Sequence, residues 1–230
     1  MPRILLISDS PHTKGLVSKL KQTYPELIIV QSGLGELDNI ESISVKDEWK
    51  MLSTDFDLII SIHCKEIFPS DLVSEVRCIN VHPGFNPFNR GWFPHVFSLI
   101  NGEPAGVTIH EMDSKIDNGP IIVQKVCKAY SWDTSLSIYN RIIELEEELV
   151  LDWFSRIIAK DYTTFSAEQP GSFNSSKDYE SLRNLSLGEK TTLGDIVNRL
   201  RALSHGEYRN AYFFDPEGKK IFVRLDLIEE

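Results

Sequence analysis

The chain carries one cluster of residues that could perform chemistry, in the stretch "NVHPGFNPFNRGW" at 80–92. Asn80 and His82 lie two apart at the end of an apolar run, and residues two apart on a strand point to the same face. An amide can stabilise an oxyanion, and an imidazole can carry a proton. The pair therefore suits a reaction at a carbonyl carbon, beside a loop too rich in Pro and Gly to be a helix.

A third candidate, Asp117, lies in "DSKIDNGPI" at 113–121. An Asp before Asn-Gly is common in turns, so a structural role is one interpretation. The other is a carboxylate that orients His82 and stabilises its charged form. A lone histidine at a strand end is more often structural than catalytic, and it is the company of Asn80 and Asp117 that favours catalysis.

The elements around this cluster predict its position. Near-continuous apolar runs that are typical of buried strands occur at 3–8, 27–32, 57–63 and 77–82. Helical patterns lie between them at 12–24 and 70–76. This alternation predicts an α/β fold with a Rossmann-like, mostly parallel sheet and helices on both faces. Ligands of such sheets collect beyond the carboxyl ends of the strands, which is where the cluster lies. No GxGxxG follows the first strand, so the dinucleotide fingerprint is missing.

The next segments continue the domain. A helix is predicted at 93–101, and a strand pair at 105–112 and 120–126 around the Asp117 turn. One long helix is predicted at 134–162, with Asp133 as its N-cap. Its apolar stripe is expected to pack into the core, and it consists of Tyr139, Ile142, Ile143, Leu149, Val150, Trp153 and Ile157.

The composition turns polar after residue 162, and "SAEQPGSFNSSKD" at 166–178 is predicted to be a linker or surface loop. A helix is predicted at 191–203, because Thr192 and Asp195 are spaced as a capping box. The segment 211–225 is predicted to be a hairpin around a Pro-Glu-Gly turn. We therefore predict a catalytic domain at 1–165 and a small C-terminal subdomain at 166–230.

The overall charge limits the partners. The formal net charge of −10 disfavours nucleic acid and anionic membranes as ligands. The chain begins with a short strand pattern rather than a signal peptide, and no apolar run has membrane-spanning length, so a cytoplasmic protein is expected. No CxxC spacing indicates a metal site, and buried reduced thiols are expected for Cys64, Cys78 and Cys127.

Several of these motifs resemble one family. Asn80-x-His82, the Arg90-Gly91 pair and "GVTIHEMDSKIDNGPII" at 106–122 resemble the folate-dependent formyltransferases. That group includes the methionyl-tRNA and glycinamide ribonucleotide enzymes, and the resemblance is strongest over 57–154. It implies that Asn80, His82 and Asp117 are catalytic and that 10-formyltetrahydrofolate donates the formyl group.

The departures from the tRNA enzymes point to one branch of that family. "PGFNPFNRGWFP" stands where they carry Ser-Leu-Leu-Pro, and a short helix and hairpin replace their large C-terminal barrel. Both features look like the nucleotide-sugar N-formyltransferases of O-antigen and capsule synthesis. The resemblance implies a dTDP-4-amino-4,6-dideoxyglucose substrate, and a homodimer is expected because a lone hairpin is marginal. The motif separates the 4-amino from the 3-amino sugars poorly.

Further site residues are implied by the same resemblance. The formyl donor is expected along "HCKEIF" at 63–68 and at the Asp117 turn, which gives His63, Lys65, Glu66, Ile67, Phe68, Asp113 and Asp117 as cofactor contacts. A nucleotide sugar needs a cation for phosphate and an aromatic face for thymine. The predicted substrate contacts are Ser8, Asp9, Lys65, Arg90, Trp92, Lys177, Tyr179, Arg209, Asn210 and Tyr212. For Lys65 and Tyr212, a solvated side chain and simple hairpin packing are the competing interpretations.

Two alternatives stay open at this point. One is a formyltransferase for another small amine, which the C-terminal appendage argues against. The other is a folate-binding or nucleotide-binding module without catalysis, which the intact Asn80, His82 and Asp117 argue against. Direct transfer is expected rather than a formylated enzyme, because no motif equips Cys64 as a nucleophile.

Overall fold

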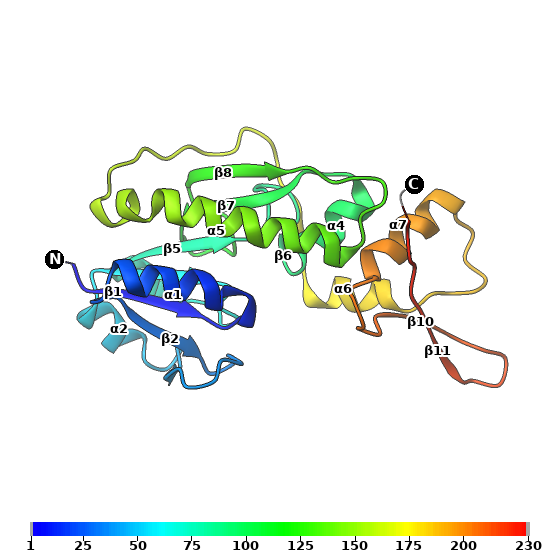
Figure 1. Cartoon of the computed structure of the whole chain (residues 1–230), viewed down its shortest axis with the longest axis horizontal. Coiled ribbons are helices and arrows are strands. Elements are labelled where there is room, and N and C mark those ends of the chain that lie inside the picture. Colours follow the sequence, from blue (N-terminus) through cyan, green and yellow to red (C-terminus); the bar gives the residue numbers. More distant parts are fainter. Residues whose placement is uncertain (1, 229–230) are drawn as a thin grey trace.

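A seven-stranded sheet organises the protein (Figure 1). The computed structural model describes residues 2–228. The strand order is β3-β2-β1-β4-β5-β7-β8, in which β3 to β5 run parallel and β7 and β8 are antiparallel to their neighbours. This confirms the predicted α/β, mostly parallel sheet. The strands are β1 (Ile4–Ser8), β2 (Ile28–Ser32), β3 (Ser42–Ile43), β4 (Leu58–Ile62), β5 (Arg77–His82), β7 (Ala105–Glu111) and β8 (Ile121–Cys127).

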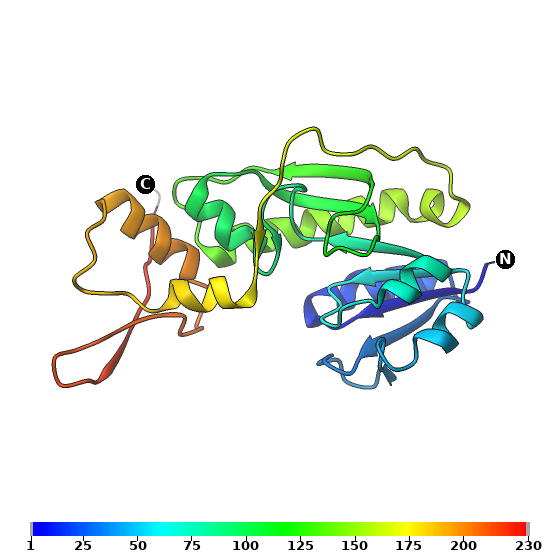
Figure 2. The same cartoon turned by 180° about the vertical axis from the view of Figure 1, so that it is seen from behind.

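Helices cover both faces of the sheet, because alternate strand residues face two separate apolar clusters. On one face lie α1 (Lys14–Thr23) and the long α5 (Ser135–Ala159). On the other lie α2 (Trp49–Asp55) and α3 (Ser70–Glu75), which the reverse view shows in front of the sheet (Figure 2). None of the helices in residues 2–228 combines the length and apolar character needed to cross a bilayer.

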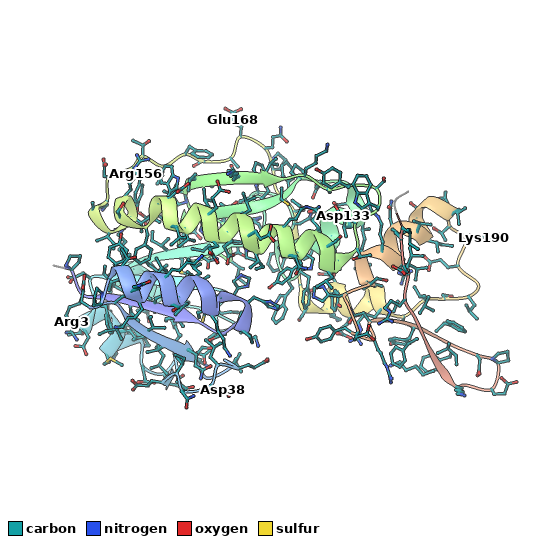
Figure 3. All side chains as sticks on the ribbon, in the orientation of Figure 1. Arg3, Asp38, Asp133, Arg156, Glu168 and Lys190 are labelled. Atoms are coloured by element: carbon teal, nitrogen blue, oxygen red, sulfur yellow. The ribbon has the colours of Figure 1, made fainter. Side chains whose placement is uncertain are left out.

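Helix α5 begins one residue later than predicted, and its N-cap is Thr134 rather than Asp133. The Thr134 hydroxyl accepts from the backbone N–H of Ser137, which forms a capping box. The Asp133 carboxylate is buried and instead accepts from the Tyr130 backbone N–H at 2.6 Å and pairs with Arg141 at 2.6 Å. Asp133 therefore closes the turn before the helix, next to the C-terminal part of the chain (Figure 3).

The predicted apolar stripe of α5 is correct in part. Ile142, Leu149, Val150 and Ile157 are buried as expected. Ile138 and Phe154 are also buried in this face, although the predicted stripe omitted them, and the predicted Ile143 and Trp153 are only half-buried. Tyr139 is a correction, because it lines a cavity instead of the core.

The segment 166–178, predicted to be a linker or surface loop, is fixed in place by strand pairing. Its strand β9 (Phe173–Asn174) pairs in parallel with β6 (Arg90–Gly91), which lies in the loop after β5. Gly91 has φ +90°, and a Cβ there would lie 2.5 Å from the carbonyl oxygen of Asn174, so only glycine fits. The polar segment thus fixes the loop that follows Asn80 and His82.

The C-terminal part contains α6 (Ser176–Arg183), which was not predicted, and α7 (Leu193–Leu203), whose capping box is confirmed. The hairpin is also confirmed, as β10 (Ala211–Phe214) and β11 (Lys220–Val223). Helix α7 packs on α4 (Pro94–Asn101) and buries Ala202 and Leu203. Arg201 donates to the Tyr130 carbonyl at 2.9 Å, so this part is also bonded to the loop between β8 and α5.

Candidate active site

A cavity of about 750 Å³ opens where strands β4 and β5 end. Its wall comes from the ends of these strands with the loops that follow, the loop after β1, the Asp117 turn between β7 and β8, helices α4 and α5, and the C-terminal part of the chain. Clefts at the carboxyl ends of parallel strands are the usual binding sites of such sheets. A volume of several hundred Å³ is typical of small-molecule sites.

The three predicted catalytic side chains meet in this cavity. Asn80 Nδ2 donates to Asp117 Oδ1 at 2.8 Å, and His82 Nδ1 lies 3.5 Å from Asp117 Oδ2. Asp117 Oδ2 also accepts from the backbone N–H of Gly91 at 3.1 Å. The carboxylate therefore fixes the amide, faces the imidazole and is itself held by the loop after β5.

Burial sets the protonation states of this group. The His82 ring is only 4% exposed, and burial lowers its pKa below the ordinary value although the Asp117 charge opposes the shift. Burial alone would raise the pKa of Asp117, but the neighbouring His82 and His110 and the Gly91 N–H hold that pKa well below its usual range. His82 Nε2 is buried and has no hydrogen-bond partner in the described chain. At neutral pH the site thus presents a neutral imidazole with a free nitrogen beside a carboxylate.

His110 completes the group, although the sequence analysis did not single it out. It lies opposite Asn80 in the antiparallel pairing of β5 and β7, and its Nε2 is 3.4 Å from Asn80 Nδ2 and 3.7 Å from Asp117 Oδ1. Its Nδ1 lies 2.7 Å from the Glu111 carbonyl. A pairing of "CINVH" with "GVTIHE" in the correct register would have found it.

One glycine lets the loop close over the imidazole. A Cβ on Gly84 would lie 2.3 Å from His82 Nε2, so any side chain there would displace the ring. Asp117 itself has φ +49°, a left-handed conformation that Asp tolerates better than most residues. The Pro and Gly content of 80–92 and the Asp-Asn-Gly turn therefore help to place the side chains of Asn80, His82 and Asp117.

Comparison with known proteins agrees with this geometry. The model described as "Formyl transferase" matches residues 2–153. The chain belongs to the formyl transferase family. A second model, described as "N-formyltransferase dimerization C-terminal domain", matches residues 178–230. The two matches fall on the two regions that enclose the cavity.

Individual relatives of this formyl transferase cover almost the whole chain. It is 46% identical over 99% of its length to a Mycobacterium tuberculosis protein named dTDP-4-amino-4,6-dideoxyglucose formyltransferase, of which 97% is covered. A crystal structure from the same organism superimposes with a TM-score of 0.97 at 46% identity, covering 100% of this chain and 99% of that one. The formyltransferase PseJ from Anoxybacillus kamchatkensis, solved with UDP-4,6-dideoxy-4-formamido-L-AltNAc and tetrahydrofolate, superimposes with a TM-score of 0.65 at 28% identity, covering 86% and 97%.

The predicted formyl-donor contacts of this formyl transferase form one wall of the cavity. All of them line it, namely His63, Lys65, Glu66, Ile67, Phe68, Asp113 and Asp117. Their polar atoms are not equally available, because the Glu66 carboxylate already accepts from the backbone N–H groups of Gly33 and Val45 at 3.0 and 2.8 Å. Glu66 therefore holds the loops behind this wall. Ile67 is 71% exposed and offers an apolar surface instead.

The predicted substrate contacts divide into two groups. Lys65, Trp92, Tyr179 and Asn210 line the cavity. Six others do not, namely Ser8, Asp9, Arg90, Lys177, Arg209 and Tyr212. Asp9 is fully buried, where its carboxylate accepts from the backbone N–H groups of Ser32 and Lys65, both at 2.6 Å.

The other five residues that do not line the cavity are exposed or contact other parts of the protein. The Ser8 hydroxyl pairs with that of Thr13 at 2.6 Å. Arg90 bonds Asn118 and borders a separate cavity of about 330 Å³. In the hairpin Lys220 lies over the Tyr212 ring at 3.6 Å, so packing is the interpretation that the structure favours for Tyr212. Arg209 lies against Phe222, and Lys177 is exposed on α6.

The far end of the cavity has an aromatic lining that sequence reasoning missed. Tyr139 from α5 packs edge-on against His12 at 5.3 Å and against His205 at 5.6 Å between ring centroids. His205 also contacts Tyr208, which is 72% exposed, at 5.7 Å. The signal was weak, because Tyr139 fell within an apolar stripe and the other three rings lie in polar segments.

The described residues hold no cluster of three His, Cys, Asp or Glu side chains suited to an ion. Burial raises the pKa of the Cys64 thiol far above neutral, and the charge of Asp9 adds to the effect. Cys64 lines the cavity as a neutral thiol, which agrees with direct transfer.

Proposed function

We propose that the protein transfers a formyl group from 10-formyltetrahydrofolate to the amine of dTDP-4-amino-4,6-dideoxyglucose. The observation that carries the proposal is the junction of Asn80, His82 and Asp117 at a cavity, in a chain 46% identical over 99% of its length to a relative of that name. The product is an N-formylated nucleotide sugar, a donor for O-antigen or another surface glycan.

The catalytic roles follow from the atoms that are free. His82 lines the cavity, and its Nε2 has no hydrogen-bond partner within residues 2–228, so it can accept a proton from the attacking amine. The Asn80 amide, fixed by Asp117, is placed to donate to the oxyanion that forms at the formyl carbon. Asp117 stabilises the imidazolium once His82 is protonated.

The formyl donor is consumed in each turnover and is therefore a substrate. The wall at 63–68 fits it, because the backbone there and the Asp113 carboxylate offer polar edges beside the apolar Ile67 and Phe68. The tetrahydrofolate bound to PseJ, a relative at 28% identity, supports the same class of ligand. When bound, it supplies the formyl carbon next to His82 and Asn80.

The nucleotide is proposed to lie at the aromatic end of the cavity. Tyr139, His205 and Tyr208 offer ring faces for a base, and Lys115 supplies positive charge for the diphosphate. Lys65 also lines the cavity, but its Nζ is paired with Glu36 Oε1 at 2.7 Å. This moves the thymine site from the predicted Tyr212 to the segment that precedes the hairpin.

The C-terminal part is proposed to form a homodimer interface. Its family match and a group of exposed apolar side chains support this assignment, namely Leu187, Leu193, Ile196, Phe214 and Phe222. We accordingly assign catalysis to 1–165 and dimerisation with part of the nucleotide site to 166–230. A cytoplasmic location is proposed because folates and nucleotide sugars are cytoplasmic metabolites.

The test is an amine panel. The purified protein is given 10-formyltetrahydrofolate with dTDP-4-amino, dTDP-3-amino, UDP-4-amino and GDP-4-amino sugars, and tetrahydrofolate and formamide formation are measured. We expect the largest kcat/KM with dTDP-4-amino-4,6-dideoxyglucose. Faster turnover of glycinamide ribonucleotide, or no formamide from any amine, would refute the proposal.

A further inference from the structure

A second ionisable pair borders the cavity next to His82. His63 follows strand β4, which runs beside β5 with Ile62 opposite Val81, so the two histidines follow one another across neighbouring strand ends. The His63 Nε2 lies 3.0 Å from both carboxylate oxygens of Glu146. Two of the imidazoles that line the cavity, His63 and His82, thus face different carboxylates.

Glu146 is unusual for its position in the fold. It lies in the middle of α5, is 1% exposed and has the buried Ile142 and Val150 four residues to either side. A buried carboxylate is costly unless it is paired and hydrogen-bonded. Within residues 2–228, His63 is its only hydrogen-bond partner. The carboxylate therefore acts on the cavity through that one ring.

The backbone of His63 is held in an uncommon conformation that brings the ring to Glu146. Its φ is +57°, in the left-handed region that residues other than Gly, Asn and Asp rarely occupy. Such strain persists where the surrounding structure fixes it, and it clusters at functional sites. His63 Nδ1 makes no hydrogen bond to the described protein, and the residue lines the cavity, so this atom is available to a ligand.

The electrostatics of the two histidines differ. Burial lowers the pKa of His63, but the charge and hydrogen bond of Glu146 outweigh it and leave the pKa raised. The other titratable groups near this ring are Tyr139 on α5, His82 at the end of β5, His95 on α4 and Lys65 two residues along. Since the pKa of His82 is lowered, the His63–Glu146 pair is the stronger proton acceptor of the two.

The proposed reaction releases two protons from the amine, so His63 and His82 could each accept one. An amino sugar arrives largely as an ammonium ion, and its nitrogen loses two protons on becoming a formamide. Only one of these ends on the nitrogen that leaves the formyl carbon, so the other must be accepted elsewhere. The Asn80, His82 and Asp117 group accounts for a single proton transfer.

We propose that His63, positioned by Glu146, takes the first proton from the substrate ammonium and leaves His82 to carry the second. This inference rests on the proposed function. The ammonium N–H bond breaks, its electron pair stays on nitrogen, and the proton passes to His63 Nδ1 and later to solvent. The amine then bonds to the formyl carbon while the carbonyl electrons move to the oxygen beside Asn80. On collapse the bond from the formyl carbon to N10 of the donor breaks, and N10 receives the electron pair with the second proton through His82.

The test uses Glu146→Gln, which keeps the size and hydrogen bonding of the side chain but removes its charge. His63→Asn is the companion variant, because Asn tolerates the left-handed backbone. We expect kcat/KM of each at pH 7 to fall about 10-fold to 100-fold, which reaches only the lower end of the range for loss of a general base because solvent can also take the first proton. The deficit should shrink as the pH rises above the pKa of the amine, because solvent then removes the first proton.

A second measurement, made without substrate, is the pKa of His63. The His63 ring is titrated by NMR in the wild type and in Glu146→Gln, and its pKa should fall in the variant because the charge that raised it is gone. Glu147→Gln is the matched control, because Glu147 is the next residue of α5 and pairs with Lys19 outside the cavity. Thermal melts establish that all variants fold.

The outcomes separate the two proposals. If the wild type transfers no formyl group to any amine, the proposed function is wrong and this inference with it. If the wild type is active and Glu146→Gln equals it at every pH, only the inference is wrong. A deficit of the same size at pH 7 and pH 9 would also overturn it, because that result indicates a structural role.

Discussion

At one end of the cavity the functional side chains come from β5, β7 and the turn between β7 and β8, and at the other they come from α5 and the segment after α7. His82 and Asn80 are held by a buried network that spans two paired strands. Tyr208, by contrast, is 72% exposed and lines the cavity with one aromatic neighbour, His205. The first end is preorganised, which suits the transition-state stabilisation proposed there. The second end is open, which suits the proposed entry of the nucleotide.

This difference has a kinetic counterpart. An interaction made only in the transition state lowers kcat when it is lost, whereas one made equally in the ground state raises KM. We therefore expect substitutions at the strand end to act on kcat and substitutions at the aromatic end to act on KM. The predictions below test this division in order of decreasing effect.

The largest effect is expected for His82→Asn and Asp117→Asn. Each should lower kcat by about 10²-fold to 10⁴-fold, the usual range for loss of general acid–base catalysis. Rapid-quench measurement of formamide formation checks this, and the thermal melt of each variant controls for folding. A variant with wild-type kcat would remove that residue from the mechanism.

The same pair makes a pH prediction with a definite sign. Burial already places the pKa of His82 below its ordinary value, and Asp117 works against that shift. Asp117→Asn removes the opposing charge, so NMR titration should show the pKa of His82 falling further. In the pH–rate profile of Asp117→Asn, the plateau of kcat should be lower than in the wild type, and no titration of His82 should appear in the neutral range. If the pKa of His82 stays unchanged or rises in Asp117→Asn, Asp117 is not coupled to His82 electrostatically.

The next effect is expected for Asn80→Ala. Loss of one oxyanion donor typically costs about 10²-fold to 10³-fold in kcat. The variant also removes a hydrogen bond to Asp117, so Asn80→Asp serves as a second variant that keeps the size but cannot donate. An unchanged kcat with a raised KM for the formyl donor would reassign Asn80 to binding.

The two ends also differ in how well the sequence predicted them. Asn80 and His82 were found because strand periodicity and a Pro-Gly loop are local signals, and Asp117 because its turn is local too. His110 and Glu146 were missed because their roles depend on the register of β5 with β7 and on the rotation of α5. A charged residue among Ile142, Leu149 and Val150 was a visible signal for Glu146.

The C-terminal contacts could not be predicted in the same way. Arg209, Tyr212 and Lys177 have suitable chemistry, but whether they face the cavity depends on how the hairpin and α6 pack. Ser8 and Asp9 lie at the end of the first strand, where ligands commonly bind. Their side chains are instead hydrogen-bonded to Thr13, Ser32 and Lys65 of the protein itself. Composition identifies the residue types a ligand needs, and only tertiary packing decides which of them are free.

A smaller effect is expected at the aromatic end. Tyr208→Ala should raise KM for the nucleotide sugar by about 10-fold, since stacking of a base on an aromatic ring is worth about 1–3 kcal/mol. The kcat should stay close to the wild-type value. Tyr212→Ala is the matched control, because Tyr212 lies outside the cavity. If Tyr212→Ala raises KM and Tyr208→Ala does not, the thymine site lies on the hairpin as the sequence first predicted.

The smallest effect on chemistry is expected for the dimer surface. Leu193 and Ile196 are 77% and 43% exposed on α7, and replacing both by Glu would bury charge at any interface built on this face. Light scattering should show a dimer for the wild type and a monomer for the double variant. Leu151→Glu, at a 41% exposed position on α5, is the control and should remain dimeric. Since Asn80, His82 and Asp117 all come from one chain, the monomer should keep its kcat. A monomer without activity would mean that the partner subunit supports the open end of the cavity, and the division between the two ends would then fail.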